Sequence, residues 1–323
     1  MNKIKENSFI KRVGVNRIVL VIVLLLMYLF FCLITKGKFL GVTRIVNSMN
    51  YAYFLGFLSL GVTFVIATGG IDFSIGPVMF CCSLISGYCL NSYGVPMALS
   101  LVISIFVGFL FGTFNGWLVS YLSVAPFIVS MASMNIAKGL ASVFTKSQSV
   151  SWPQLAQGGW YRYLVKYNDI PTGLIILLVF AIICGILMNQ TRVGRYILCL
   201  GSNSEAARLS GINVNKWRML AYVICGTLVG IGAIMFVGAY TTVQPGYGDQ
   251  YNNEAIAGAV MGGTSMAGGI ASIAGTILGV FVISLLQEGI LAMGFTKDYQ
   301  LILTGIIVIV AVYLDIMARR RKN

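Results

Sequence analysis

Long apolar runs recur along the whole sequence, separated by short polar segments. Most are close to the ~20 residues that an α-helix needs to cross the hydrocarbon core of a bilayer. Hydrophobic residues make up 58% of the chain and charged residues only 10%, whereas about a quarter of the residues of a soluble domain carry charge. The sequence therefore predicts an all-α membrane protein with about ten transmembrane helices. Their approximate limits are 18–35, 51–68, 75–90, 97–121, 126–146, 173–190, 218–239, 254–268, 270–291 and 300–317.

No polar stretch is long enough to form a separate soluble domain. The longest, residues 145–171, is too short for an independent core, so residues 1–323 are predicted to form a single transmembrane domain. The formal net charge of +13 would suggest a nucleic-acid partner in a soluble protein. Here the cations lie between apolar runs, where they orient a membrane protein instead. We therefore expect membrane lipid, and no nucleic acid, to contact the chain.

The cysteines and the missing histidines bear on metal binding and redox chemistry. The seven cysteines include no C-x-x-C pair, and the chain has no histidine. Metal-ligand spacing is therefore absent, and no bound metal is expected. Nearly all the cysteines lie in apolar runs, where they are predicted to act as small buried hydrophobic residues.

The first apolar run, 18–35, follows a basic segment and in this respect resembles a signal peptide. It is, however, about as long as a spanning helix needs to be. The residues that follow it, Lys36, Gly37 and Lys38, give no small-residue cleavage pattern. We therefore expect this run to be a retained first helix.

The Lys and Arg residues between the runs predict an orientation, because cytoplasmic segments carry an excess of them. Five precede the first run and four lie at the C-terminal end, so both termini are predicted to be cytoplasmic. The segment 191–217 carries four against one acid and is also predicted to be cytoplasmic, with six crossings before it. The aromatic-rich segment 147–172 and the segment 240–253, which has no Lys or Arg, are then extracytoplasmic. One outward loop violates the rule through three cations: Lys36, Lys38 and Arg44.

Glycine is abundant, with 37 residues, and many glycines repeat every four residues. Gly108, Gly112 and Gly116 share one face of their predicted helix. Small residues at this spacing let helix backbones approach closely in lipid. The pattern favours close helix packing, and hinges for gating are the alternative.

Two glycine-rich segments place polar backbone at membrane depth. Residues 69–76 read Gly-Gly-Ile-Asp-Phe-Ser-Ile-Gly, and residues 262–269 read Gly-Gly-Thr-Ser-Met-Ala-Gly-Gly. Each interrupts an apolar run in its half of the chain, and interrupted helices at corresponding positions indicate a solute site. Whether the two octets reflect an internal duplication or a chance match is open. The glycines predicted to break the helices are Gly69, Gly70, Gly76, Gly262 and Gly263.

Asp72 makes the first break more informative, because a carboxylate within a membrane needs a partner or water. Asp72 either caps a helix that starts near Phe73, by accepting hydrogen bonds from free N–H groups, or contacts the solute directly. The two roles are compatible. Polar residues within other runs, among them Lys138 and Glu288, either line a path or face water near a span end. The candidate residues of a translocation path are Asp72, Ser74, Asn135 and Glu254.

The segment 191–217 contains a predicted short helix. Ser202 and Glu205 form a Ser-x-x-Glu capping box, the helix runs from about Asn203 to Leu209, and Gly211 can terminate it. An amphipathic helix outside the bilayer is suited to docking on a soluble partner.

The residues of this helix resemble a known motif. The run Glu205-Ala206-Ala207, with Gly211 four positions later, resembles the Glu-Ala-Ala…Gly motif of permease subunits in ATP-binding-cassette (ABC) importers. The segment 69–76 is similar to the Gly-Gly-Ile-Asp-Leu-Ser-Val-Gly signature of the ribose/xylose/galactose permease branch, with Phe73 and Ile75 as departures. Further segments that resemble this branch are 126–129, 138–141, 194–203 and 253–279.

The resemblance implies a permease subunit of a binding-protein-dependent ABC importer that carries a monosaccharide across the cytoplasmic membrane. The permease would form a homodimer or pair with a homologous permease, and an extracytoplasmic binding protein would deliver the sugar. Two ABC ATPase domains would supply the energy by binding the ATPase-coupling residues Glu205, Ala206, Ala207, Arg208 and Gly211. The chain has no G-x-x-x-x-G-K-[ST] phosphate loop, so it is not predicted to be an enzyme. No bound cofactor is expected, because ATP would bind to the partner subunit.

Several alternatives stay open. Related permeases carry nucleosides, the autoinducer-2 furanosyl signal or branched-chain amino acids. A stand-alone secondary transporter would need relay carboxylates in its spans, for which Asp72 and Glu288 are the plausible residues. A membrane enzyme would need clustered catalytic groups, which the sequence does not show.

Overall fold

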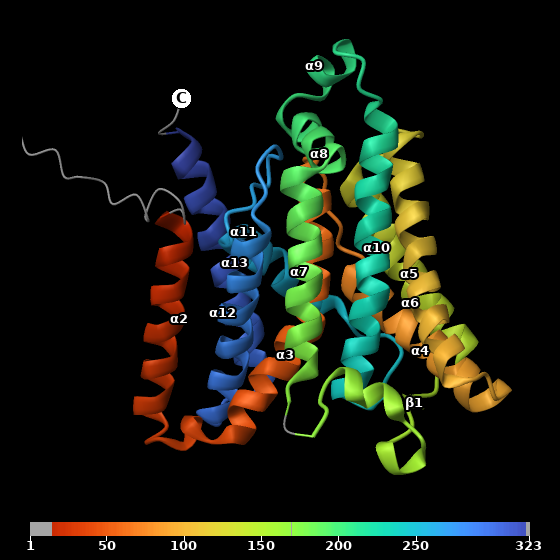
Figure 1. Ribbon diagram of the computed structural model, residues 1–323, viewed down its shortest axis with the longest axis vertical. Coiled ribbons are helices and arrows are strands. Elements are labelled where there is room, and N and C mark those ends of the chain that lie inside the picture. The colour runs from red at the N-terminus through yellow and green to blue at the C-terminus, as the bar shows by residue number, and fades with distance from the viewer. Residues whose placement is uncertain (1–14, 169, 321–323) are drawn as a thin grey trace, which may run out of the picture.

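The computed structural model describes residues 15–168 and 170–320, which form a bundle of helices (Figure 1). The long helices are α2 (Val15–Ile34), α3 (Val42–Ala67), α4 (Ile75–Tyr93), α5 (Met97–Ser120), α6 (Pro126–Phe144), α7 (Thr172–Gln190), α10 (Val214–Ala239), α12 (Ile273–Ala292) and α13 (Lys297–Arg320). Shorter helices are η1 (Lys38–Leu40), η2 (Leu155–Gln157), η3 (Trp160–Leu164), α8 (Arg192–Ser202), α9 (Ser204–Leu209) and α11 (Asp249–Met261). The two-residue strands β1 (Val150–Ser151) and β2 (Thr242–Val243) pair antiparallel.

Within the described part of the chain, eight helices are long and apolar enough to cross a membrane: α2, α3, α4, α5, α6, α7, α10 and α12. The other two predicted runs coincide with α11 and α13. The prediction of an all-α membrane protein is thus confirmed, and each predicted run contains a helix.

The predicted limits of the run 254–268 are wrong. Helix α11 begins earlier, at Asp249, and ends at Met261 after 13 residues. It is about 20 Å long at ~1.5 Å per residue, shorter than the ~30 Å core of a bilayer. Residues 262–272 are not helical, because the glycines of the second predicted break end the helix.

Different elements lie at the two ends of the bundle (Figure 1). The start of α2, the end of α13 and the pair α8–α9 lie at one end, here called the α8–α9 end. The turn between α2 and α3 lies with β1 at the other, here called the β1–β2 end. The start of α2, the end of α13 and the segment 191–217 thus share a side, as the predicted arrangement requires. The cytoplasmic location of the two termini stays a prediction, because residues 1–14 and 321–323 lie outside the described residues.

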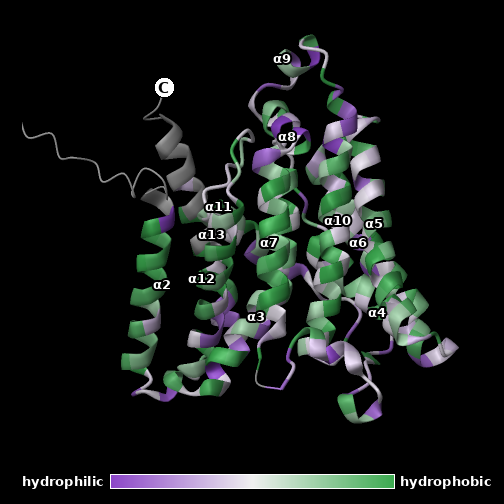
Figure 2. Ribbon diagram, viewed as in Figure 1, coloured by the Kyte–Doolittle hydropathy of each residue, from purple (hydrophilic) through white to green (hydrophobic). Residues whose placement is uncertain are grey.

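Helix α3 lies at the centre of the bundle. All its residues from Ala52 to Ala67 are buried, and it packs against α7, α10, α11 and α12. The outer helices carry their apolar side chains outward, as the green surfaces of α2 and α7 in Figure 2 show. Leu25 and Leu33 of α2 are among these exposed residues. An outer surface of this kind suits contact with lipid tails.

The glycine repeats lie where helix backbones touch. A Cβ atom on Gly108 of α5 would lie 2.3 Å from the carbonyl oxygen of Gly226 on α10, and one on Gly112 would lie 2.4 Å from that of Tyr222. Side chains larger than hydrogen cannot fit at these distances. The structure therefore confirms the prediction that these glycines serve close helix packing.

Candidate functional site

The first break separates α3 from α4. Gly69 has a φ of +79°, a conformation that favours glycine, and Gly70 lies against the Tyr222 hydroxyl. Gly76 lies in the first turn of α4 and not in the break itself. A Cβ on Gly76 would lie only 2.1 Å from the carbonyl oxygen of Gly248. The glycine at 76 therefore allows a close backbone contact between α4 and the residue that precedes α11.

Asp72 lies in a closed polar network at this break. Its side chain is buried, with 3% exposed. Its Oδ1 accepts hydrogen bonds from the Ser74 backbone N–H at 2.8 Å and the Ser74 hydroxyl at 2.6 Å. Its Oδ2 accepts one from the Asn115 amide at 3.4 Å, and the Asn115 oxygen accepts one from the Ser133 hydroxyl. The network joins α5 and α6 to the entry of α4 and provides the partners that a buried carboxylate requires.

The start of α4 is capped from another helix. Helix α4 begins at Ile75, two residues later than the predicted start near Phe73. The Asp72 carboxylate bonds to the N–H just before the helix, whereas the Gly76 N–H donates to the Asn252 side chain of α11 at 2.7 Å. An asparagine from α11 therefore satisfies one of the orphan donors of the first turn of α4.

Glu254 belongs to a separate polar network, one half-turn beyond Asn252 on α11. Its side chain is also 3% exposed. It accepts hydrogen bonds from the Gln287 amide of α12 at 2.6 Å and from the Tyr51 hydroxyl of α3. The structure thus places Asp72 with Ser74, and Glu254 in a different set of contacts.

Glu254 borders a cavity of about 360 Å³, here called the α11 cavity. Residues from α3, α10, α11, α12 and α13 line it. Four aromatic residues form part of its wall: Tyr51, Phe236, Tyr240 and Tyr251. The lining residues come from the start of α3, the end of α12 and the start of α13, so the cavity lies toward the β1–β2 end.

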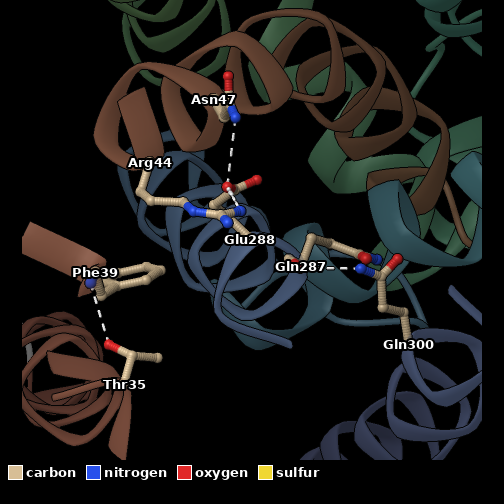
Figure 3. Close-up of polar contacts among 7 residues, drawn as sticks. All are labelled: Thr35, Phe39, Arg44, Asn47, Gln287, Glu288 and Gln300. Atoms are coloured by element: carbon tan, nitrogen blue, oxygen red, sulfur yellow. Dashed lines mark hydrogen bonds and ion pairs between the residues drawn. The ribbon is translucent and has the colours of Figure 1, made fainter. Parts of the chain in front are cut away.

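Glu288 is a second carboxylate in the lining of this cavity, and it pairs with Arg44 (Figure 3). The Arg44 guanidinium donates to Glu288 Oε1 at 2.8 Å, and the Asn47 amide donates to the same oxygen at 3.4 Å. The Gln300 amide donates to the Gln287 carbonyl oxygen at 2.9 Å. One of the cations that violates the charge rule therefore neutralises a largely buried carboxylate near the end of α12.

Asn135 and Lys138 lie on α6, away from the α11 cavity. Asn135 is exposed. The Lys138 ammonium pairs with the Asp249 carboxylate at 2.5 Å, and the two side chains are 24% and 54% exposed. Charged groups do not face lipid tails at membrane depth, so this side of α6 and α11 suits contact with water or another protein.

The second break, residues 262–269, lies against the chain at the first break. Gly263, Gly268 and Gly269 all have positive φ angles, and Gly262 follows the last residue of α11. The Gly269 N–H donates to the Ala67 carbonyl oxygen at 3.0 Å, at the end of α3. The two predicted breaks therefore lie side by side.

Helix α8 packs where the two breaks meet, here called the junction of the two breaks. A Cβ on Gly201 would lie 1.9 Å from the Ala67 oxygen and 2.3 Å from the Gly269 nitrogen. The junction of the two breaks is therefore in direct contact with the segment that carries α9.

Helix α9 matches the predicted short helix, but its cap differs from the prediction. Ser202 is the last residue of α8, and its hydroxyl donates to the Leu198 carbonyl oxygen at 3.0 Å. Asn203 is the N-cap, and its side chain accepts from the Ala206 N–H at 2.9 Å. The predicted capping box is wrong, because Asn caps helices as well as Ser does and stands one residue later. Gly211 follows the helix with a φ of +79°, as an αL residue after a helix end requires.

Helix α9 projects beyond the bundle at the α8–α9 end (Figure 1). Glu205 and Arg208 pair at 2.6 Å with both side chains 64% exposed. The hydrogen bond from Arg208, and then its charge, lowers the pKa of the Glu205 carboxyl below its ordinary value. Ala206 and Leu209 are exposed beside them, whereas Ala207 is buried against the bundle. The helix therefore presents an ion pair and small apolar groups to a partner.

Sequence reasoning missed Asn115 and Asn252, which bond to the predicted residues Asp72, Ser74 and Gly76, and Ser133, which bonds to Asn115. It also missed Tyr51 and Gln287, the partners of Glu254. Among the described residues, no group of three or more His, Cys, Asp or Glu side chains is placed to hold a metal ion.

Comparisons with known proteins identify relatives over most of the chain. The family model for the permease component of branched-chain amino acid transport systems matches residues 44–312. The ribose import permease protein RbsC of Bacillus subtilis is 32% identical over 87% of this chain and 87% of its own length. The xylose transport system permease protein XylH of Escherichia coli is 28% identical, over 98% of this chain and 95% of its own. The fructose import permease protein FrcC of Rhizobium meliloti is 28% identical, over 93% and 85%. No solved structure matches the chain.

Proposed function

This chain belongs to the family of permease components of branched-chain amino acid transport systems, and on that premise we propose that it is the transmembrane permease subunit of an ABC importer for a monosaccharide. The observation that carries the proposal is the set of relatives, which are permeases for ribose, xylose and fructose and align with this chain over most of both lengths. The Gly-Gly-Ile-Asp segment at residues 69–72 supports the sugar-type branch.

The energy for transport comes from a separate ABC ATPase that binds α9. Exposure of Glu205, Ala206 and Arg208 at the tip of the bundle supports this docking site. The contact of Gly201 in α8 with both helix breaks provides a route from the ATPase to the membrane part. The α8–α9 end is then cytoplasmic, the chain crosses the cytoplasmic membrane ten times, and an extracytoplasmic sugar-binding protein docks at the β1–β2 end.

A second permease, either an identical copy or a homologue, completes the transporter. The Lys138–Asp249 pair and Asn135 support an interface or water-filled path on their side of α6, since such groups are costly in lipid. The remaining cargo candidates are nucleosides, autoinducer-2-like furanosyl compounds and branched-chain amino acids. A stand-alone secondary transporter is disfavoured, because relatives of this length are named import permeases.

The test is uptake by proteoliposomes that contain the permease, its ATPase and the sugar-loaded binding protein. Labelled ribose, xylose and fructose are offered with and without ATP, beside a nucleoside and leucine. ATP-dependent accumulation of one of the sugars is the expected result. Accumulation of only the nucleoside or leucine would change the cargo, and uptake driven by an ion gradient without ATP would overturn the importer assignment.

The docking assignment is tested separately with Glu205→Lys. Because Glu205 is exposed and bonds only to a residue of its own helix among the contacts described, the variant should fold and reach the membrane normally. Transport and stimulation of the ATPase should fall by at least ~10-fold, since the charge at the docking surface is reversed. Lys216→Glu, a charge reversal outside α9, is the matched control. Normal coupling in Glu205→Lys would show that α9 is not the docking helix.

A further inference from the structure

We propose that a groove beside α2 holds an acyl chain of a phospholipid whose anionic headgroup is bound by Lys36 and Lys38. The groove, here called the α2 groove, lies between α2, the turn that follows it, the start of α3 and α12. The proposed function enters only through its orientation, by which the β1–β2 end, and therefore this lipid, is extracytoplasmic.

The α2 groove has the size and the lining that a hydrocarbon chain needs. Its volume is about 320 Å³. Apart from Tyr28, Ser48 and Ser284, all its lining residues are apolar, and the Ser284 hydroxyl donates to the Val280 carbonyl oxygen of its own helix at 2.8 Å. An apolar cavity of ~150 Å³ stays free of water and takes up a molecule the size of benzene. The groove therefore suits a run of methylene groups and not a polar solute.

The groove lies at the depth of the acyl chains of one leaflet. Tyr28 and Leu24 line it and lie six and ten residues before Ile34, the last residue of α2. At ~1.5 Å per residue these positions are about 9 and 15 Å from that end of the helix. Half of the hydrocarbon core of a bilayer is ~15 Å thick. A lipid with its headgroup at the end of α2 would thus have its chain beside these residues.

Helix α2 leaves this groove open toward the outer surface. It lies at the edge of the bundle (Figure 1) and packs chiefly against α12, and only 11% of residues Arg17–Ile34 are buried. Leu24, Tyr28 and Phe281 in the groove wall are half-buried. An empty groove would deprive its walls of dispersion contacts, and within a membrane an acyl chain restores them.

The turn after α2 places two cations directly above the groove. The Thr35 hydroxyl accepts a hydrogen bond from the Phe39 N–H at 3.1 Å and donates to the Phe31 carbonyl oxygen at 2.7 Å (Figure 3). Phe39 is fully buried and lines the groove. Lys36 and Lys38, beside these two buried residues, are exposed. The same short turn therefore supplies an apolar wall and two positive charges at the membrane surface.

These cations are the ones that violated the charge rule of the sequence. The third, Arg44, is neutralised by Glu288, whereas no carboxylate among the described residues pairs with Lys36 or Lys38. Basic side chains at a membrane surface attract anionic headgroups, and a lysine ammonium binds a phosphate group as a point charge. An acidic surface of the binding protein could also meet these lysines, but it would not fill a groove that reaches to the depth of Leu24.

The first experiment measures which lipid occupies the groove in the assembled importer. The permease and its ATPase are reconstituted in phosphatidylcholine vesicles with a small admixture of a lipid that carries a diazirine halfway along one acyl chain. That lipid is either phosphatidylglycerol or phosphatidylcholine. After illumination, cross-links are counted only on peptides from the groove segments 24–28, 45–49 and 281–285, so that lipids bound at other basic surfaces do not contribute.

Phosphatidylglycerol should cross-link to these segments about 10-fold more than phosphatidylcholine, because two lysines attract its charge. Lys36→Gln with Lys38→Gln should reduce this ratio to within about twofold of unity. The matched control is Lys146→Gln with Arg162→Gln, which removes two cations from the segment around β1 and away from the groove. It should keep the wild-type ratio.

Three results would overturn the site. Equal cross-linking by the two lipids in the wild type would mean that any acyl chain fills the groove. No cross-links on the three segments would mean that protein, such as the second permease, covers it. An unchanged ratio in the Lys36→Gln, Lys38→Gln variant, together with weaker binding of the binding protein, would assign these lysines to that protein.

The second experiment fills the groove from inside. Ser48 lines it, and its buried hydroxyl has no hydrogen-bond partner among the described residues. Ser48→Phe should lower cross-linking of phosphatidylglycerol to segments 24–28 and 281–285 by about 5-fold or more, because the ring takes the space of the chain. Ser48→Ala, which removes the same hydroxyl without filling the groove, should stay within about twofold of the wild type. Equal cross-linking of the two variants would contradict a chain in the groove.

Uptake by the wild-type importer separates this site from the proposed function. If the wild type accumulates a sugar but the groove shows no preference for phosphatidylglycerol, the lipid site is wrong and the function stands. If the preference is found but no sugar is accumulated, the lipid site stands and the proposed function is wrong.

Discussion

Asp72 and Glu254 are two buried carboxylates of the same protein in opposite surroundings. Each is 3% exposed, and the sequence analysis placed both on one translocation path. Asp72 is enclosed by Ser74 and Asn115, next to the backbone that it holds. Glu254 is held by Tyr51 and Gln287 but borders the α11 cavity. Asp72 bonds to its own loop and to α5, and a carboxylate enclosed in this way fixes structure, whereas one beside a cavity can also serve a ligand.

Asp72→Ala should have the largest effect, and the effect should be on folding. The substitution leaves the Ser74 N–H and the Ser74 hydroxyl without their acceptor in a buried site, whereas the Asn115 amide keeps the Ser74 hydroxyl oxygen as an acceptor at 3.0 Å. Each buried group that loses its partner costs about 1–3 kcal/mol, so a total loss near 3 kcal/mol is expected. The measurement is the thermal unfolding midpoint in detergent, together with the yield of monodisperse protein.

Asp72→Asn is the matched variant, because its side-chain oxygen can still accept from Ser74. It should keep most of the stability and at least half of the transport. If Asp72→Asn folds like the wild type but no longer transports, the carboxylate charge acts on the solute, and the contrast with Glu254 fails.

Glu254→Gln should have the next largest effect, and on transport instead of folding. The amide keeps the shape of the side chain and retains one acceptor oxygen for Tyr51 or Gln287. The cavity loses a carboxylate acceptor, and hydrogen bonds to charged groups are worth about 1.5–3 kcal/mol. Uptake by reconstituted importer should fall at least ~10-fold, while the unfolding midpoint changes little. A fall in stability as large as that of Asp72→Ala would show that Glu254 is a structural carboxylate too.

The sequence predicted parts of both regions for different reasons. The apolar runs were sufficient to predict the long helices, because the bilayer fixes the length of a span. The Lys and Arg residues between them were sufficient to predict which segments share one end of the bundle, because charge is biased between the two sides of a membrane. The hydrogen bond from the Ser74 backbone to Asp72 could be inferred from the sequence, since an Asp side chain bonds readily to the backbone two residues on. Asn115 lies 43 positions from Asp72, Gln287 lies 33 from Glu254, and Asn252 lies 176 from Gly76, and only helix packing brings these partners together. The prediction of the α9 N-cap was wrong for a local reason, because Ser202 and Asn203 are both good N-cap residues.

Arg44 shows how tertiary structure explains an apparent exception. In the sequence it only violated the charge rule, since no pattern there connects it with a carboxylate 244 positions away. In the fold it donates to Glu288 at 2.8 Å. Arg44→Leu should therefore leave Glu288 unpaired and destabilise the protein, and Arg44→Leu with Glu288→Gln should recover much of the loss. Failure of the double variant to recover stability relative to Arg44→Leu would show that the pair has no such coupling.

Asn252→Ala should have the smallest of these effects and is the sharpest test of the division between the two regions. Asn252 bonds to the Gly76 N–H at 2.7 Å and belongs to the same helix as Glu254, so it directly connects the start of α4 with the cavity helix. Loss of one cap should cost about 1 kcal/mol of stability, and the Gly76–Gly248 backbone contact remains. If the regions act independently, uptake by the reconstituted importer should be unchanged in Asn252→Ala, and only the unfolding midpoint should move. If uptake falls although Glu254 is intact, the entry of α4 helps to position α11, and the first break acts together with the α11 cavity.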